Sequence, residues 1–231
     1  MAVTVIKDIR LFRSAVPNVD GSPLPDYIDD RAADVTAHRI AMKLREGGFS
    51  LGDFDHLYIN FTPCLPDGEI RPAARSVSRE TTWYRFYDVS VDDVSVNDVG
   101  VNDTGGVPTD RMIAAIERVL LEVFSTPETE TLIRDSVRAA VTEGDRMLMR
   151  FKQKTNGSHT AVVYLRCTDD GRYVPLVCVY DADGQELARG EVAETVDLMS
   201  VGEVRLGAHK VTVLPRRNAL TAGMVPFELT F

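Results

Sequence analysis

Arginine and aromatic residues are gathered in the stretch EIRPAARSVSRETTWYRFYDV, residues 69–89. Between residues 70 and 87, four arginines stand against a single acid, Glu80, which gives a local charge of +3 (4 − 1) in a chain whose net charge is −9. Such side chains dominate interface energetics because they bury large areas and still form hydrogen bonds, and they also stack on nucleobases. The candidate binding residues of this stretch are Arg71, Arg75, Arg79, Trp83, Arg85 and Tyr87.

The density of aromatic residues at the end of this stretch predicts a strand. Side chains alternate along a strand, so Trp83, Arg85 and Tyr87 would share one face, and Tyr84 and Phe86 would share the other. One face would then belong to the core, while the other could form a binding surface. The alternative interpretation is that all the aromatic side chains belong to the core and that the arginines form a solvated or acid-paired rim.

An acidic near-repeat follows directly, DVSVDDVSVNDVGVNDTGG at residues 88–106. Its unit is five residues of acid and valine, so successive valine pairs would fall on opposite faces of a strand. We therefore expect the first unit to complete the preceding strand and the rest to form a solvated acidic internal loop within residues 88–107. A recognition loop for a basic partner is the alternative. Its candidate binding residues are Asp92, Asp93, Asp98 and Asp103.

A metal site is a third interpretation of the acidic segment, because Asp98, Asn102 and Asp103 could supply oxygen ligands for calcium. The segment lacks the ligand order of an EF-hand loop. The four histidines of the chain are far apart and show no zinc-binding spacing: His38, His56, His159 and His209. We therefore expect neither a metal nor another cofactor.

The common catalytic signatures are missing from the sequence, which has no nucleophile elbow and no glycine-rich phosphate loop. No catalytic residue is predicted. Arg216 and Arg217 lie beside a loop of small residues, which is either an anion-binding turn or an ordinary basic loop end.

The composition is that of a globular protein with a sizeable core, since 44% of the 231 residues are hydrophobic and 26% are charged. No apolar stretch is long enough to span a membrane, the first residues do not resemble a signal peptide, and three widely spaced cysteines form no disulfide framework. These features indicate a cytoplasmic protein without a membrane partner. Six of its 35 acids lie between Asp88 and Asp110, which leaves 29 acids against 26 bases elsewhere. We expect no non-specific nucleic-acid binding, because such binding depends on neutralising phosphates.

Strands and helices that position these residues are predicted in separate runs. Strands are expected at residues 3–13, at 56–65 and from Trp83, with a helix from about Asp30 to Gly47 between the first two. A helix with Thr109 as N-cap and a second helix beginning at Thr126-Pro127 would form an αα-hairpin. From Arg146 onward, strands separated by turns such as Asn156-Gly157 predict an antiparallel meander.

The predicted fold class is therefore α+β. An antiparallel β-meander in the C-terminal half would pack with an αα-hairpin and an N-terminal strand–helix–strand unit. We expect a single domain over residues 1–231, and two subdomains at 1–87 and 107–231 are the alternative.

The sequence favours a non-catalytic protein-binding module, for example an inhibitor or immunity-type protein that masks a partner with a basic surface. Two other classes stay open: an enzyme with a carboxylate and arginine site for a small anionic or nucleotide substrate, and a structural subunit of an assembly. A pocket with a carboxylate of perturbed pKa near Arg71, Arg75 or Arg85 would favour the enzyme. A flat surface with the acidic loop at its rim would favour the binding module, and a large apolar patch would favour the structural subunit.

Overall fold

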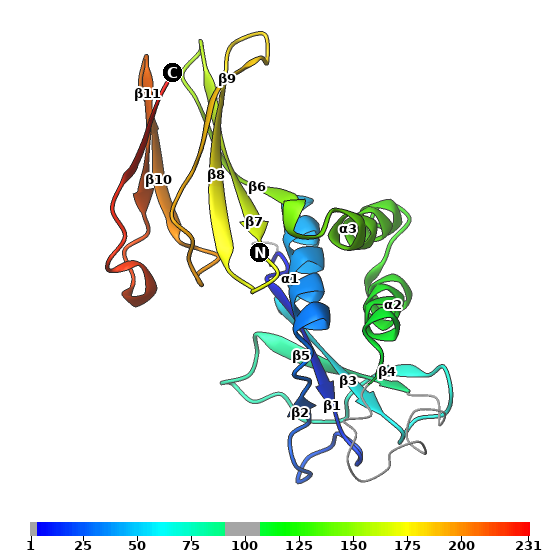
Figure 1. Ribbon diagram of the computed structural model, residues 1–231. Coiled ribbons are helices and arrows are strands. Elements are labelled where there is room, and N and C mark those ends of the chain that lie inside the picture. Colours follow the sequence, from blue (N-terminus) through cyan, green and yellow to red (C-terminus); the bar gives the residue numbers. More distant parts are fainter. Residues whose placement is uncertain (1–3, 91–106) are drawn as a thin grey trace. The chain divides into compact units, whose positions relative to one another are not determined.

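The structure is a computed structural model that describes residues 4–90 and 107–231 (Figure 1). The chain divides into two compact units, Met1–Thr142 and Glu143–Phe231. The acidic segment, which the sequence marks as an alternative boundary, falls inside the first unit. Whether the chain unfolds as one domain stays a prediction.

The first unit is built on a five-stranded mixed sheet with the strand order β2-β1-β3-β5-β4. The three central strands are parallel, and the short outer strands β2 and β4 are antiparallel to their neighbours. The predicted strand–helix–strand unit is β1-α1-β3, whose two strands are adjacent in the sheet. The elements are β1 (Asp8–Arg13), β2 (Asp26–Tyr27), α1 (Arg31–Glu46), β3 (His56–Thr62), β4 (Ile70–Pro72), β5 (Tyr84–Ser90), α2 (Thr109–Val119), a π-helical turn (Leu120–Phe124) and α3 (Glu130–Glu143).

Helix α1 begins and ends where the sequence predicts. The Asp30 side chain accepts a hydrogen bond of 2.9 Å from the backbone N–H of Ala33, so it caps the first turn. Gly47 is the C-cap, and Gly48 follows with φ of +73°, a left-handed conformation that favours glycine. Together these residues fix the length of the helix that crosses from β1 to β3.

The two faces of the central strands differ in chemistry. Ile9 and Leu11 of β1 and Leu57 and Ile59 of β3 are buried and belong to the core that also contains the apolar side of α1. The alternate positions carry an aromatic cluster of Phe12, Tyr58, Tyr84 and Phe86, whose neighbouring rings lie 4.5–5.7 Å apart. The sheet therefore has an aliphatic face and an aromatic face.

The predicted helix pair follows the acidic segment, with small changes at its boundaries. Pro108 is the cap of α2, and Thr109 is its first residue, so the predicted N-cap is one position too late. The Thr109 hydroxyl instead donates to Asp30 Oδ2 at 2.8 Å, which links the starts of α2 and α1. Arg134 of α3 lies 3.6 Å from Glu117 of α2.

The second unit is antiparallel throughout, as predicted. One sheet contains β6 (Leu148–Thr155), β7 (Thr160–Cys167), β8 (Tyr173–Tyr180) and β9 (Glu186–Glu191). The other contains β10 (Val201–Leu206), β11 (Lys210–Pro215) and β12 (Phe227–Thr230). Strand β10 lies against β6 and β12 lies against β9, so the two sheets approach each other at both pairs of edges. The short 3₁₀ turns are Gly144–Arg146 and Ala219–Thr221.

The predicted turn at Asn156-Gly157 connects β6 and β7. Gly157 has φ of +89°, and the Asn156 N–H donates to the His159 carbonyl at 3.1 Å, which closes the loop. The α+β fold class is thus confirmed, with a parallel centre to the first sheet that the sequence did not indicate.

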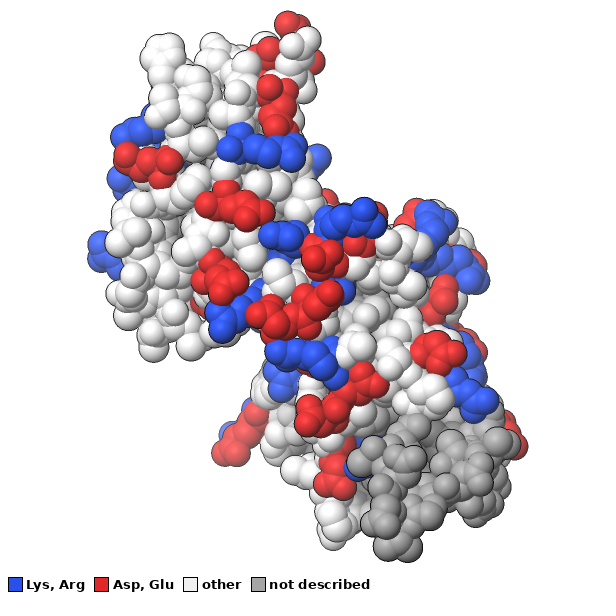
Figure 2. Space-filling model, in the orientation of Figure 1, with Lys and Arg blue, Asp and Glu red and all other residues white. Residues whose placement is uncertain are grey.

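Surface charges on the visible face are intermixed rather than segregated (Figure 2). Many are paired on the same element, such as Arg134 with Glu130 at 2.9 Å and Arg189 with Glu186 at 2.6 Å. Within residues 4–90 and 107–231, no helix is both long enough and apolar enough to cross a membrane.

Candidate binding surface

Arg75 joins two loops that lie far apart in the sequence. Its Nε donates to Asn18 Oδ1 at 2.8 Å, and its Nη2 donates to the carbonyls of Ser22 and Pro23, both at 2.9 Å. A planar guanidinium can satisfy several acceptors at once in this way, because its donors point in fixed directions. Arg75 therefore holds the loop between β1 and β2 against the segment that precedes β5.

Two more contacts strengthen this connection. Val19 and Ala74 form an isolated parallel bridge. The backbone N–H of Ser76 donates to Asp20 Oδ1 at 2.8 Å. We call residues 14–27 and 73–83, which these contacts join, the two-loop surface.

The two-loop surface carries every exposed large hydrophobic side chain among the described residues 4–90. These side chains come from both loops, which the contacts around Arg75 hold together. They are Val16, Val19, Leu24, Tyr27, Val77 and Trp83, with exposed fractions between 38% and 63%. Exposed hydrophobic residues normally occur singly, and groups of them are typical of interaction sites.

Trp83 does not lie on the face that the sequence predicts. Its ring packs edge-on against His56, Tyr58 and Tyr84, with centroid distances of 4.6, 6.0 and 4.7 Å. The strand begins only at Tyr84, and the N–H groups of Asp55 and His56 bond to the Trp83 carbonyl. Trp83 therefore precedes the regular alternation, and the predicted grouping with Arg85 and Tyr87 is wrong for this residue. It stays 42% exposed.

Arg85 and Tyr87 share a face of β5, as alternation requires. The Arg85 guanidinium donates to Asp53 at 3.0 Å and to the carbonyls of Thr82 and Tyr84, and it lies 5.3 Å from the centre of the Phe54 ring. The Tyr87 ring packs edge-on against Phe124 at 5.1 Å, and burial raises the pKa of its hydroxyl. Both side chains are thus largely committed to contacts within the unit.

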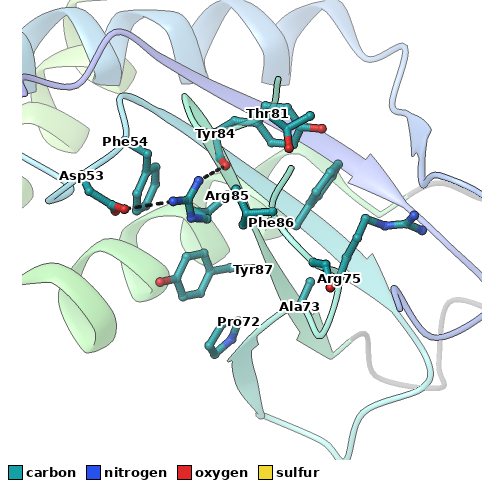
Figure 3. Close-up of a pocket in the computed structure, with 12 residues that line it drawn as sticks. Asp53, Phe54, Pro72, Ala73, Arg75, Thr81, Tyr84, Arg85, Phe86 and Tyr87 are labelled. Carbon is teal, nitrogen blue, oxygen red and sulfur yellow. Dashed lines mark hydrogen bonds and ion pairs between the residues drawn. The ribbon is translucent and has the colours of Figure 1, made fainter. Parts of the chain in front are cut away.

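A pocket of about 270 Å³ opens between β5 and the segment 72–81 (Figure 3). Tyr84, Phe86 and Tyr87 are among its lining residues. The Arg85 side chain turns toward Asp53, whereas the Arg75 side chain extends away from Asp53. Val77 lines the pocket and also belongs to the two-loop surface. The pocket is therefore continuous with that surface.

The remaining predicted residues are less involved. Arg71 lies 3.7 Å from Glu69, and Arg79 is exposed in the turn before β5 and forms no ion pair within the described part of the chain. Asp92, Asp93, Asp98 and Asp103 lie outside the described residues. Of the predicted set, the structure brings Arg75, Trp83, Arg85 and Tyr87 to the pocket and its surroundings.

A buried polar cluster at the carboxyl ends of the parallel strands was not predicted. The Asn60 amide donates to Asp88 Oδ1 at 2.7 Å and to Ser14 Oγ at 3.0 Å, and Asp88 is only 4% exposed. Burial raises the pKa of Asp88, while hydrogen bonds from Asn60 and Asn18 and the charges of Arg71 and Arg75 oppose that rise. The one sequence signal was an asparagine in the middle of the apolar run HLYINFT.

We expect replacement of Asp88 by asparagine to stabilise the protein at neutral pH. The folded state raises this pKa above its unfolded value of 3.8, so stability falls as the pH rises from that value to the folded pKa, and the loss is constant above it. Asparagine keeps an acceptor for Asn60 and carries no charge. In urea unfolding, the free energy of unfolding of Asp88→Asn should rise relative to that of the wild type between about pH 3 and pH 7.

Asp20→Asn is the control for this measurement. The pKa of Asp20 is lowered, mainly by the hydrogen bonds from Ser76, so its carboxylate contributes stability that is lost as the pH falls. The control should therefore lose stability relative to the wild type at neutral pH. A constant difference between Asp88→Asn and the wild type at all pH values would contradict the assignment.

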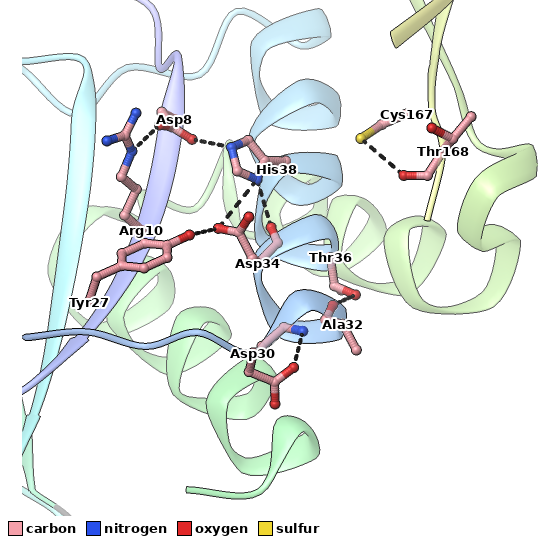
Figure 4. Close-up of polar contacts among 11 residues, drawn as sticks. Asp8, Arg10, Tyr27, Asp30, Ala32, Asp34, Thr36, His38, Cys167 and Thr168 are labelled. Carbon is pink, nitrogen blue, oxygen red and sulfur yellow. Dashed lines mark hydrogen bonds and ion pairs between the residues drawn. The ribbon is translucent and has the colours of Figure 1, made fainter. Parts of the chain in front are cut away.

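A second polar cluster fixes Tyr27, one of the exposed hydrophobic residues, at the edge of the sheet (Figure 4). The Tyr27 hydroxyl donates to Asp34, and burial together with this bond raises its pKa. The side chain of His38, a residue of α1, reaches β1. Its Nδ1 lies 2.7 Å from the Asp34 carbonyl, and its Nε2 lies 3.2 Å from Asp8 Oδ1. Asp8 also accepts from Arg10 at 2.7 Å. In residues 4–90 and 107–231, no three His, Cys, Asp or Glu side chains are grouped so as to hold a metal ion.

Comparison with known proteins gives no relative: no family model matches the chain, and neither a curated protein nor a solved structure shows significant similarity to it.

Proposed function

We propose that the protein is a non-catalytic protein-binding module and that the two-loop surface is its contact site. The observation that supports this most is the gathering of six exposed hydrophobic side chains on two loops joined through Arg75. Exposing these side chains to water costs free energy, roughly 25 cal/mol for each Å² of apolar surface. A partner that covers them recovers that cost.

Trp83 is the side chain best suited to anchor the partner. Tryptophan is enriched among interface residues that carry most of the binding energy. Three neighbouring rings hold its orientation, so little conformational entropy is lost when the partner covers the exposed part. The adjoining pocket of about 270 Å³ could accept a side chain of the partner.

The partner we propose has a basic surface. The acidic segment begins at the end of β5, in the same unit as the two-loop surface, and contains no Lys or Arg. Clustered carboxylates raise the rate of encounter with a basic protein. A concrete version is a cytoplasmic inhibitor or immunity-type protein that masks the active site of a basic partner.

A second candidate is an enzyme or receptor for a small anionic ligand. The observation that favours it is a carboxyl group of raised pKa, Asp88, near Arg71 and Arg75. Asp88 is not among the residues that line the pocket, however, so the perturbed carboxylate and the cavity are separate features. This separation makes the binding module better supported than the enzyme.

The proposal is tested by replacing Trp83 with alanine and measuring partner binding. Proteins retained from the native host by the immobilised wild-type chain are compared with those retained by Trp83→Ala and by Leu187→Ala. Leu187 is 46% exposed on β9 of the second unit and serves as the matched control. We expect Trp83→Ala to cost about 2 kcal/mol or more of affinity, roughly 30-fold in Kd, mainly through faster dissociation.

A partner that binds Trp83→Ala as tightly as the control would refute the proposed surface. The same assay tests the acidic segment through the joint replacement of Asp92, Asp93, Asp98 and Asp103 by asparagine. If these carboxylates steer the encounter, the association rate should fall and depend less on salt, with little change in dissociation.

A further inference from the structure

The second unit has its own group of exposed hydrophobic side chains, on two loops at one end of the three-stranded sheet. Val196 lies between β9 and β10, and Leu220 and Val225 lie between β11 and β12. Their exposed fractions are 63%, 63% and 77%, and Val225 is the most exposed large hydrophobic residue in the described part of the chain. We call these three residues the apolar tip.

The two loops are joined by hydrogen bonds. The Asn218 side-chain amide donates to Asp197 Oδ2 at 2.7 Å, and the Arg216 N–H donates to the Ser200 carbonyl at 2.7 Å. Val196 directly precedes Asp197, and Leu220 follows Asn218 by two positions. The apolar side chains are therefore presented by one connected structure.

In the turn that carries Leu220, the polar Thr221 is buried and the apolar Leu220 is exposed. Asn218 Oδ1 accepts from the N–H groups of Leu220 and Thr221 at 2.9 and 3.0 Å, which caps a single 3₁₀ turn. Thr221 is 3% exposed, and its hydroxyl bonds to the Arg216 carbonyl. The Thr221 hydroxyl is satisfied inside the turn, and Leu220 is left outside, where an apolar surface could cover it.

Basic side chains accompany the apolar tip. Arg216 and Arg217 are exposed, residues 216–226 contain no acid, and neither arginine forms an ion pair with a described residue. Lys152 of β6 bonds to the Gly202 carbonyl, and burial and then the nearby charge of Arg216 lower the pKa of Lys152. Positive charges are thus brought together here, and the Asp197 carboxylate of the same structure bonds to Asn218 and forms no ion pair with either arginine.

We propose that the apolar tip and its two arginines dock on the surface of an anionic lipid bilayer. Leu220, Val225 and Val196 would enter the region between headgroups and acyl chains, while Arg216 and Arg217 contact lipid phosphates and carboxylates. The sequence argues against a segment that spans a membrane. Docking on the surface of a membrane requires no such segment. The anionic cytoplasmic leaflet is accessible to a cytoplasmic protein.

The residue types favour lipid over a second protein partner. Valine and leucine are under-represented among the residues that dominate protein interfaces, where tryptophan and tyrosine are enriched. The tip contains only aliphatic side chains, whereas the two-loop surface of the first unit combines four aliphatic side chains with Trp83 and Tyr27. The two surfaces therefore differ in the partner that they suit.

Sedimentation of the full chain with vesicles tests this proposal. One set contains phosphatidylcholine alone, and the other adds about 30% phosphatidylserine to provide the anionic charge. We expect the protein to pellet with the anionic vesicles only, and reversibly, since raised salt screens the arginine contribution. The joint variant Leu220→Asp/Val225→Asp and the joint variant Arg216→Gln/Arg217→Gln should each reduce the bound fraction about tenfold or more.

Two controls separate local effects from changes of net charge. Leu187→Asp adds an acid at an exposed site on β9, and Arg189→Gln/Arg205→Gln removes two arginines that are paired with Glu186 and Glu203. Both should pellet like the wild type, and far-UV circular dichroism confirms that each variant is folded. Absence of pelleting with both vesicle types overturns the proposal, as does pelleting that the tip variants retain. Binding to polyglutamate but not to vesicles would identify the surface as a site for an acidic protein instead.

Discussion

Replacing Arg75 with alanine should lower the free energy of unfolding by roughly 2–4 kcal/mol, since each lost hydrogen bond to a charged group is worth about 1.5–3 kcal/mol. The guanidinium bonds to Asn18 and to the Ser22 and Pro23 carbonyls. Asn18 is only 2% exposed, so its acceptor would be left unpaired in the interior. The expected loss of stability is smaller than the sum over these hydrogen bonds, because part of the network is exposed to water. Chemical denaturation followed by the fluorescence of Trp83, the single tryptophan, measures this effect in the first unit.

The same substitution should weaken partner binding even though Arg75 need not touch the partner. Without the guanidinium, the loop of Val16, Val19 and Leu24 is held less firmly against the segment of Val77 and Trp83, so a partner must order both loops on binding. For the stability measurement, Arg79→Ala is the matched control, because Arg79 is exposed and lies in the same segment. Its effect on stability should stay within about 0.5 kcal/mol.

Arg75→Lys separates charge from geometry. Lysine keeps the charge but lacks the planar set of donors, so we expect it to recover only part of the lost stability. Equal unfolding curves for Arg75→Ala and Arg79→Ala would show that Arg75 does not hold the two loops together.

Replacing Gly202 with alanine should destabilise the second unit by about 1–3 kcal/mol or more, the usual cost of overpacking. A Cβ atom at this position would lie 2.9 Å from the carbonyl oxygens of Leu214 and Pro215 and 3.0 Å from the Arg216 nitrogen. These are backbone atoms of the neighbouring strand end, and they cannot rotate away as a side chain can. Differential scanning calorimetry of the full chain measures the loss.

Gly223→Ala is the control for this substitution, because a Cβ atom there would meet nothing within 4 Å. It should melt like the wild type or slightly higher, since alanine reduces the entropy of the unfolded chain.

The Trp83 fluorescence of Gly202→Ala also tests the predicted single domain. If the chain unfolds as one domain, the tryptophan transition in the first unit should shift together with the calorimetric transition. A wild-type melting temperature for Gly202→Ala would show that the β10–β11 contact can relax.

The fold class and several element boundaries could be predicted because local chemistry determines them. Asp30 and Gly47 bound α1, and Asn156-Gly157 forms the hairpin between β6 and β7. The parallel order of β1, β3 and β5 could not be predicted, because it depends on contacts between residues far apart in the sequence. Buried parallel strands read as continuous apolar runs, and HLYINFT matches that pattern without indicating a direction.

The candidate site was predicted in composition but not in arrangement. The stretch from Arg71 to Tyr87 does include the pocket residues Arg75, Arg85 and Tyr87. The loop between β1 and β2 was not recognised as part of the site, because long-range contacts of Arg75, Ala74 and Ser76 bring it there. The position of Phe124 was also missed. This residue lies in a π-helical turn, whose wider spacing differs from the α-helical repeat of apolar residues used for prediction.

The parallel centre of the first unit affects how the chain reaches its native state. Residue 8 pairs with residue 56 and residue 56 with residue 84, separations of 48 (56 − 8) and 28 (84 − 56) residues. In the second unit, Thr155 pairs with Thr160 across a separation of five (160 − 155). Bringing distant segments together costs loop entropy before any contact repays it, so non-local pairing slows folding. The parallel pairing of β1, β3 and β5 should therefore form later than the Thr155–Thr160 hairpin, and its aliphatic strands need protection from aggregation until it does.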